Sequence, residues 1–287
     1  MIIRCGAGRG KQFNEFVMRK IVLYSFVALM AVSMMGGCGI TKILRSDDPE
    51  LIYNTALDFK QKEKWSRAYT LFESVEHYYV GSPREDSIIF YRALCKYRDR
   101  DYSESSDILD EFRRRFGRSV FIEDAECMYA LCYYYMSPGP TRDQTITSKA
   151  LQALGEFIVR YPDSEHVENF HKVIDELTAR LHEKSYNNAY TYYKIGRYNS
   201  AIVALRNALR EYPESFRREE LMYLMVKSAY RLADNSVAGK QHDRYIDMLD
   251  SYYTFLDEFP DSQHRRELDR MARNAKDFID KNSKEND

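Results

Sequence analysis

A short phrase recurs along the chain and constrains its fold more than any other feature. An aromatic residue followed by Pro, an acidic residue and Ser occurs as "YPDS" (161–164), "YPES" (212–215) and "FPDS" (259–262). Each copy follows a stretch in which apolar residues recur at helical spacing, and proline does not continue a helix. The recurrence predicts a chain built from copies of one helical unit, each ended in the same way.

The clearest copy of the unit is "YYKIGRYNSAIVALRNALREYPES", residues 192–215. Gly196 marks a tight turn between two helices, after which Ala201, Leu205 and Ala208 recur on one face of the second helix. The small residues let two helices approach closely, and the larger ones fill the space between them. The segment resembles the tetratricopeptide repeat, a helical hairpin with small and large residues at fixed places.

Weaker copies of the pattern divide the chain into five repeats and a closing helix. The expected boundaries are 49–83, 84–118, 119–164, 165–215 and 216–262, with a capping helix over His264–Lys281. Insertions at 136–145 and 232–241 lengthen the third and fifth repeats. Because such repeats bury their apolar faces only by stacking, we expect an all-α fold, a tetratricopeptide-like solenoid of helical hairpins with a concave side.

The head of the chain differs from the rest. Arg19 and Lys20 precede an apolar stretch, residues 21–35, which is shorter than the roughly 20 residues that span a bilayer. Two glycines and Cys38 follow directly. This order resembles a bacterial lipoprotein signal, in which the chain is cut before the cysteine and the cysteine carries the lipid.

We therefore expect residues 1–37 to be a signal peptide, residues 38–48 to be a lipidated tether, and Cys38 to be the site of lipidation. Met18 looks like a more natural start than the first residue, so the segment before it is interpreted as an over-extended start. An uncleaved N-terminal anchor, or a signal cut elsewhere, is the alternative. The covalent lipid is the only non-protein group that we expect, and no further cofactor.

Charge and motifs exclude several classes of function. The chain has 43 basic and 44 acidic residues, so no basic excess favours binding to nucleic acid. The sequence has no G-x-S-x-G, no H-E-x-x-H and no phosphate-binding loop. His166 and His171 are five residues apart and fall on different faces of a helix. We expect no catalytic residues, no metal site and no enzyme activity.

Three cysteines, Cys95, Cys127 and Cys132, fall within apolar helical stretches. An odd number prevents full pairing, although one disulfide could form in an oxidising envelope. Their surroundings favour buried thiols.

Tyrosine is unusually common, with 24 Tyr against a single Trp. Aromatic and cationic side chains together grip an extended peptide, especially one ending in an aromatic residue and a carboxylate. Alignment to the tetratricopeptide repeat places on the inward faces of the first helices a peptide groove of Tyr53, Lys60, Phe90, Tyr97, Arg98 and Tyr134. Packing between repeats is the alternative role for each, since a slip of one residue turns a helix face by about 100°.

A lipoprotein signal followed by five irregular repeats, over residues 38–281, resembles the BamD family. The resemblance is carried by Tyr53, Ala56, Trp65, Ala68, Phe72, Tyr102, Ser105, the three closing phrases and "SAYRLA" at 228–233. Members are outer-membrane lipoproteins of the β-barrel assembly machinery that face the periplasm. The resemblance implies that this chain is a scaffold of that machinery.

The same resemblance implies a division of labour. The N-terminal repeats, 49–164, would receive targeting segments of unfolded outer-membrane proteins. The C-terminal repeats and the cap, 165–287, would dock on the periplasmic domains of the barrel-forming partner, with Arg231 at the position that contacts it. Alternatives are an adaptor for cell-wall or division enzymes, or a glycan-binding surface lipoprotein, which is usually a much longer chain with large loops.

Overall fold

The computed structural model describes residues 38–285, and every regular element in that range is helical. The first helices are α2 (Cys38–Leu44), α3 (Pro49–Gln61), α4 (Trp65–Val75), the 3₁₀ turn η1 (Glu76–Tyr78), α5 (Glu85–Arg98) and α6 (Tyr102–Arg115). They are followed by α7 (Ile122–Met136), α8 (Thr145–Arg160), α9 (Val167–Lys194), α10 (Tyr198–Glu211), α11 (Arg218–Asp234), α12 (Ala238–Glu258) and α13 (Arg265–Glu285). The expected signal peptide, residues 1–37, lies outside the described residues.

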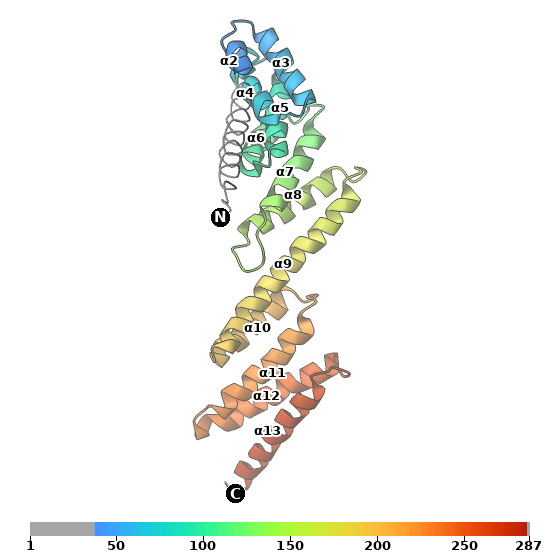
Figure 1. Ribbon diagram of the computed structural model, residues 1–287. Coiled ribbons are helices and arrows are strands. Elements are labelled where there is room, and N and C mark those ends of the chain that lie inside the picture. The colour runs from blue at the N-terminus through green and yellow to red at the C-terminus, as the bar shows by residue number, and fades with distance from the viewer. Residues whose placement is uncertain (1–37, 286–287) are drawn as a thin grey trace, which may run out of the picture. The chain divides into compact units, whose positions relative to one another are not determined.

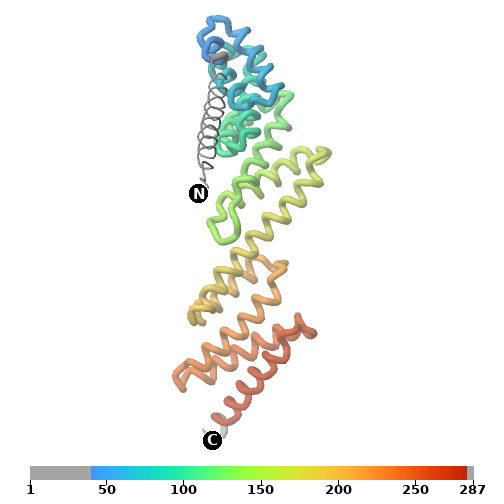
Figure 2. Tube along the Cα trace, viewed as in Figure 1, coloured from blue at the N-terminus to red at the C-terminus, as the bar shows by residue number. Residues whose placement is uncertain are grey.

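The helices pair into hairpins, as the repeats predict. The pairs are α3/α4 and α5/α6, then α7/α8, α9/α10 and α11/α12, and α13 closes the series (Figure 1). The Cα trace shows the helices as successive rods, with a longer loop between α7 and α8 than in the neighbouring hairpins (Figure 2). The expected all-α fold class, five hairpins with a capping helix, is confirmed.

The chain divides into two compact units, of which the first ends at Ile122 and the second begins at Glu123. The sequence had divided the repeats after residue 164 by their proposed roles, which is a different criterion from compactness. In the structure the helices of the third repeat, α7 and α8, share a core with α9. Ala130 of α7, Leu154 of α8 and Phe170 of α9 are buried together in that core.

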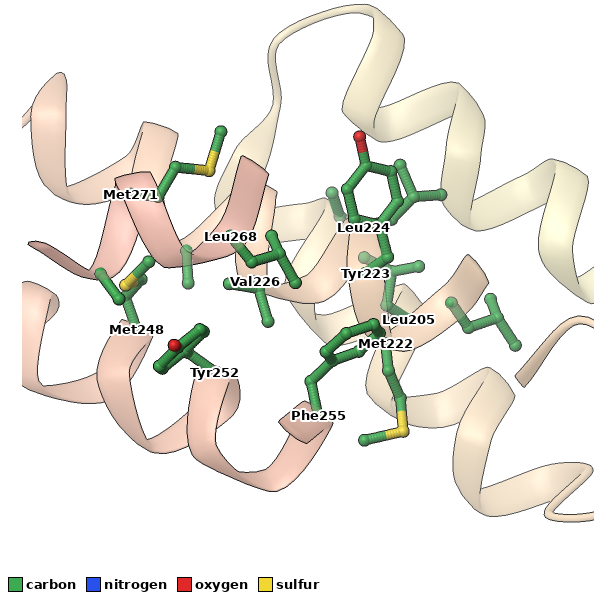
Figure 3. Packing of buried hydrophobic residues seen from close by; sticks show 14 of the residues in the cluster. Leu205, Met222, Tyr223, Leu224, Val226, Met248, Tyr252, Phe255, Leu268 and Met271 are labelled. Atoms are coloured by element: carbon green, nitrogen blue, oxygen red, sulfur yellow. The ribbon is translucent and has the colours of Figure 1, made fainter. Parts of the chain in front are cut away.

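The core of the last hairpins explains the pattern of small and large residues. Ala201, Leu205 and Ala208 of α10 are buried, as the helical spacing predicted. In Figure 3, Met248, Tyr252 and Phe255 of α12 point into the same core as Leu268 of the capping helix. The apolar face of α13 therefore covers the last hairpin, and its other face carries charge.

One turn geometry ends every repeat. In each of the five turns a serine amide donates to the carbonyl of an aromatic residue three positions earlier, and the serine Oγ accepts from the amide two positions later, at 3.0 to 3.4 Å. The aromatic–serine pairs are Tyr79–Ser82, Phe116–Ser119, Tyr161–Ser164, Tyr212–Ser215 and Phe259–Ser262. The first two lack the Pro-acidic step, so the phrase read from the sequence is one version of a more general turn.

The turn inside a hairpin has a second recurring geometry. Glu63, Arg100 and Gly196 adopt left-handed backbone conformations, with φ of 55°, 64° and 74°. The amide of the following residue then bonds the carbonyl five positions earlier, which satisfies the free end of the first helix. The third and fifth repeats connect their helices differently, through residues 137–144 and 235–237, which overlap the two predicted insertions.

Most of the expected tether, residues 38–48, is the helix α2. Its Ile40, Ile43 and Leu44 pack against the core of the first unit. Asp48 then caps α3, because its carboxylate accepts hydrogen bonds from the amides of Glu50 and Leu51. The segment that follows Cys38 is therefore a helix packed against the first unit, and not an extended linker.

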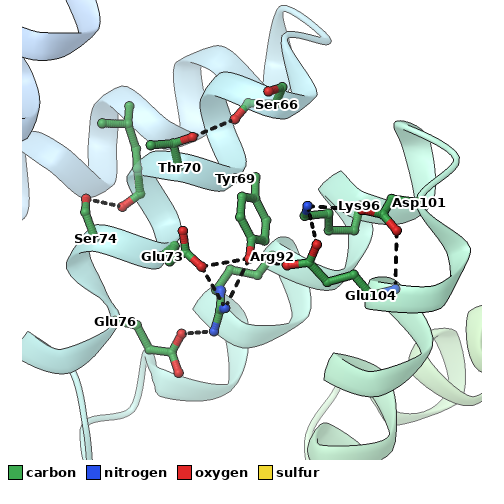
Figure 4. Close-up of polar contacts among 11 residues, drawn as sticks. Ser66, Tyr69, Thr70, Glu73, Ser74, Glu76, Arg92, Lys96, Asp101 and Glu104 are labelled. Atoms are coloured by element: carbon green, nitrogen blue, oxygen red, sulfur yellow. Dashed lines mark hydrogen bonds and ion pairs between the residues drawn. The ribbon is translucent and has the colours of Figure 1, made fainter.

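A polar network joins α4, α5 and α6 in the first unit (Figure 4). Arg92 of α5 pairs with Glu76 and Glu73, and Lys96 of the same helix pairs with Glu104. The Tyr69 hydroxyl lies 2.6 Å from a Glu104 oxygen and 2.7 Å from a Glu73 oxygen. Burial, reinforced by these carboxylates, raises the pKa of Tyr69 to about 12, so the phenol stays protonated and the network stays intact at neutral pH.

The three cysteines of the repeats are buried in the structure, and Cys95 and Cys127 are free thiols. Burial raises the pKa of Cys95 and of Cys127 to about 12, which leaves little thiolate at neutral pH. These thiols are packing residues of the helices on which they lie, as the sequence favoured.

Candidate functional site

A cationic and aromatic surface lies on the first helices of the two hairpins of the first unit. Tyr53 and Lys60 are seven residues apart on α3 and therefore share a face. Lys60 reaches across to α5, where its Nζ lies 3.6 Å from the centroid of the Tyr91 ring. We call Tyr53, Lys60 and Tyr91 the α3–α5 surface.

Lys60 is the electrostatic centre of this surface. Its side chain is half-buried, and within the described part of the chain no carboxylate pairs with it. Burial lowers the pKa of its ammonium, because the charged form loses water that no acidic partner replaces. A cation over an aromatic face without an anionic partner is suited to receive a carboxylate from outside the chain.

Tyr53 has a different neighbourhood at the start of α3. Its ring meets Phe72 edge-on at 6.1 Å and lies 5.8 Å from the Tyr79 ring. The Arg84 guanidinium lies 5.2 Å from the Tyr53 centroid and also pairs with Glu50 at 2.5 Å. Tyr53 thus packs against the core of the first unit while the Arg84 cation lies over its ring.

Phe90 does not belong to this surface. It is 6% exposed and stacks on Phe121, with ring centroids 4.6 Å apart. The sequence alignment was displaced by one residue here, and the next residue, Tyr91, faces Lys60 instead. The displacement turns the helix face by about 100°, which exchanges a core position for a surface position.

Tyr97 and Arg98 lie in the last turn of α5. Arg98 follows Tyr91 by seven residues and so continues its face, and its guanidinium lies 5.8 Å from the Trp65 ring. Tyr97 meets Tyr102 edge-on at 5.6 Å, across the turn between α5 and α6. Arg98 is exposed and extends the α3–α5 surface, whereas Tyr97 packs against the neighbouring helix.

Tyr134 lies in the second unit, on α7. Its hydroxyl donates to Glu176 of α9 at 2.9 Å, and the Arg180 guanidinium lies 5.8 Å from its ring. The hydrogen bond to Glu176, together with burial, raises the pKa of Tyr134. The structure therefore shows this residue in the packing of α7 on α9 within the second unit, whereas Tyr53 and Lys60 belong to the first.

Arg231 is exposed in the last turn of α11, and no ion-pair partner for it occurs among residues 38–285. One turn earlier, the ammonium of Lys227 already has partners within the chain. It donates to the Tyr223 hydroxyl at 2.8 Å and pairs with Glu267 of α13 at 3.1 Å. Burial alone would lower the pKa of Lys227, but these partners hold it above its ordinary value. Arg231 is thus the available cation of this helix end.

A ladder of tyrosines on α9 was not singled out from the sequence. Tyr186 stacks on Tyr190 with centroids 5.7 Å apart, and Tyr190 stacks on Tyr193 at 6.2 Å. Arg217 lies 4.8 Å from the Tyr186 ring, and Lys194 lies 5.7 Å from the Tyr190 ring. The spacing of four and then three residues between the tyrosines is the signal that could have revealed the ladder.

Other kinds of site find no support in the part of the chain that the structure describes. No group of His, Cys, Asp and Glu side chains there could hold a metal ion. Over the same range, none of the helices combines the length and the apolar character that crossing a membrane requires.

Comparison with known proteins places these features in a family. The model of the YfiO family, described as outer membrane lipoprotein, matches residues 45–242 and again 182–283. The chain belongs to this family. The match extends over all five hairpins and into the capping helix, so both the α3–α5 surface and Arg231 lie on family sequence.

Curated relatives carry the name outer membrane protein assembly factor BamD. The protein of Caulobacter vibrioides is 25% identical over 216 residues, which cover 74% of this chain and 71% of the relative. The protein of Pasteurella multocida is 19% identical over 233 residues, covering 78% of this chain and 89% of the relative. These matches support the resemblance to the BamD family.

Solved structures with similar chains include tetratricopeptide-repeat proteins. A tetratricopeptide-repeat protein of Bacteroides fragilis is 13% identical, with 82% of this chain and 100% of that chain covered and a TM-score of 0.40. The TPR2AB domain of yeast Sti1, in a complex with pHSP90, is 13% identical, with 79% of this chain and 98% of that chain covered and a TM-score of 0.36.

Proposed function

We propose that the chain is a lipid-anchored scaffold of the outer-membrane β-barrel assembly machinery. The family match and the naming of its relatives as outer membrane protein assembly factors support this proposal. The scaffold would be attached through a lipid on Cys38, face the periplasm, and act without chemistry of its own. Affinity would come from aromatic anchors and charge pairs on helix faces.

The α3–α5 surface is the proposed contact for unfolded outer-membrane proteins. The observation that carries this assignment is Lys60, a half-buried cation over the Tyr91 ring without an acidic partner among the described residues. An extended segment that ends in an aromatic residue and a carboxylate offers the two complementary groups. Its ring would pack near Tyr53, and its carboxylate would pair with Lys60 or Arg98.

The end of α11 is the proposed contact for the barrel-forming partner. Arg231 is exposed there without a partner in the described chain, while Lys227 is already held by Tyr223 and Glu267. A planar guanidinium suits bidentate pairing with a carboxylate on a folded periplasmic domain. The interface would be of the standard size for stable complexes, on the order of 1,200–2,000 Å².

Site-specific photocrosslinking in intact cells tests both contacts. A photoreactive phenylalanine at Tyr53 probes the α3–α5 surface, and one at Asp234 probes the end of α11 without removing Arg231. Val159, which is exposed on α8, is the control position. We expect unfolded barrel proteins to be captured from position 53 and the barrel-forming protein from position 234. Capture of peptidoglycan synthases or hydrolases instead would indicate an adaptor for cell-wall enzymes.

A further inference from the structure

The exposed large apolar side chains of the first unit gather at one edge. Among its described residues they are Leu51 (45% exposed), Tyr78 (54%), Val80 (68%) and Val120 (87%). Leu51 lies in the first turn of α3, the next two lie in and just after η1, and Val120 lies between α6 and α7. We call these four residues the turn edge.

Hydrogen bonds join these three segments. Glu50, next to Leu51, accepts a hydrogen bond from the Tyr79 hydroxyl at 3.0 Å. The connection after η1 in turn adjoins the connection after α6, because the Ser119 hydroxyl donates to Asp86 at 2.7 Å. A cavity of about 680 Å³ lies between the two connections, lined by Ser82 and Pro83 on one side and by residues 116–119 on the other. The turn edge is thus one continuous side of the unit.

The opposite ends of the same hairpins have another character. The connection between α3 and α4 consists of Lys62, Glu63 and Lys64, and that between α5 and α6 consists of residues 99–101, Asp-Arg-Asp. These turns are charged, and no exposed large apolar residue of the described first unit lies in them. The apolar side chains therefore mark one edge and are not spread around the unit.

The point where the chain would join a membrane is held near this edge. Helix α2 starts at Cys38, directly after the two glycines that follow the apolar stretch 21–35, and its seven residues span about 10 Å. Ile40 and Ile43 fix α2 to the core, and Asp48 caps the turn of α3 that contains Leu51. A lipid on Cys38 would therefore be separated from the turn edge by one short helix, α2.

We propose that the turn edge rests on the bilayer surface, with Tyr78, Val80 and Val120 at the headgroup level. The proposal rests on the membrane attachment at Cys38 proposed above. Valine and tyrosine at the tips of turns present apolar surface, and the tyrosine adds a polar end that suits a membrane interface. Arg45 and Arg118 are exposed near this edge without an ion-pair partner in the described chain, and lipid phosphates would be their counter-ions.

A single tryptophan placed at the edge tests this contact in the full acylated chain. Trp65 is the only tryptophan of the sequence, so W65Y gives a background without one. In that background V80W and V120W probe the turn edge, and K62W probes the opposite edge of the same unit. The vesicles contain phosphatidylethanolamine and phosphatidylglycerol at a ratio of about 3:1, with or without bromine on the acyl chains as a quencher.

We expect brominated lipid to reduce the fluorescence of V80W and V120W at least twofold and to leave that of K62W unchanged. Flotation of each chain with the vesicles is measured in the same samples. Flotation with equal quenching at all three positions would overturn the turn edge as a membrane contact and leave the anchor intact. Failure to float would overturn the anchor and this proposal together. The proposal would also be overturned if the tryptophans at positions 80 and 120 became shielded from solvent only when a partner protein is added.

Discussion

The ammonium of Lys60 lies 3.6 Å from the centre of the Tyr91 ring, so a cation of the first hairpin is placed over an aromatic ring of the second. The contact joins two helices whose backbones are connected only through α4 in sequence. It also leaves the charge of Lys60 uncompensated by any acid among the described residues. Lys60 therefore has a packing role in the structure and a proposed role in binding, and substitutions can separate the two.

Lys60→Met is expected to weaken the binding of a peptide that ends in an aromatic residue and a carboxylate. Methionine retains an apolar stem over the Tyr91 ring and removes the charge. Loss of one charge-assisted contact should lower the affinity roughly tenfold, or by about 1.4 kcal/mol. Fluorescence anisotropy of a labelled peptide measures the change.

Lys62→Met is the matched control, since Lys62 is exposed and already pairs with Asp58 at 2.8 Å. It should bind the peptide as the unaltered chain does. A peptide whose terminal carboxylate is amidated should no longer distinguish Lys60→Met from the parent. Equal affinities of Lys60→Met and the parent for the free-acid peptide would exclude Lys60 as the carboxylate site.

Ala201→Trp is expected to destabilise the second unit by about 1–3 kcal/mol or more, because Ala201 is fully buried where α10 packs into the core. Urea unfolding followed by circular dichroism measures the loss. Val203→Trp, two residues away and half exposed, should leave the midpoint nearly unchanged. An unaltered midpoint for both variants would mean that α10 does not pack through Ala201.

Arg100→Gly is expected to stabilise the first unit. A non-glycine residue at φ of 64° destabilises the folded state by about 1–2 kcal/mol, which glycine avoids. Glycine also has more conformational freedom in the unfolded chain, which lowers the stability by about 0.5–1 kcal/mol. The expected net increase in the free energy of unfolding is therefore about 0.5–1 kcal/mol. Asp99→Gly is the control, because Asp99 has an ordinary φ of −76° and gains nothing from glycine. The melting temperature should rise for Arg100→Gly and fall for Asp99→Gly.

Glu267 should make the second unit sensitive to acid. Hydrogen bonding from Tyr223, followed by Lys227, holds the pKa of this carboxyl below its ordinary value of 4.5. The corresponding stabilisation is complete above that ordinary value and is lost as the pH falls through the lowered pKa. Glu267→Gln should therefore reduce the difference in unfolding free energy between pH 7 and pH 3. Glu168→Gln, at an exposed pair with Lys172, should leave that difference as it is.

Cys38→Ala should release the protein from membranes into the soluble periplasm, because each buried CH₂ of a lipid chain contributes about 0.8 kcal/mol to membrane binding. Fractionation of cells, followed by detection of the chain in membrane and soluble fractions, measures this. Firm attachment of the variant to membranes would contradict the lipid anchor at this cysteine.

Much of the fold could be predicted because its signals are local. Proline, small residues and helical spacing located the hairpins around Ala201 and Leu205, and the structure confirms them. The first two closing turns were not recognised, since Tyr79 and Phe116 share with the later copies only the aromatic residue and the serine. The extent of the second compact unit was not predicted, because it depends on α9 packing against α7 and α8, which no local pattern encodes.

The site was harder to predict, because it depends on which side of a helix faces its neighbour. Tyr53 and Lys60 were found on α3, but on α5 the alignment selected Phe90 in the core instead of Tyr91. Both are aromatic and adjacent, so composition could not separate them. The tyrosine ladder of α9 was not recognised, although its spacing of four and then three residues was a usable signal; its three rings pack against the core of the second unit.

Within each unit, the serine turns that end the repeats restrict the path of the chain from one hairpin to the next. Extra length is found instead in the connections within the third and fifth hairpins, at 137–144 and 235–237. Lineages that lengthen or shorten this protein would therefore be expected to do so at the same places, as would an engineer inserting a fluorescent reporter beside Gly139. Within the second unit, a change in the spacing between an aromatic residue and its serine would instead change the direction of the helix that follows.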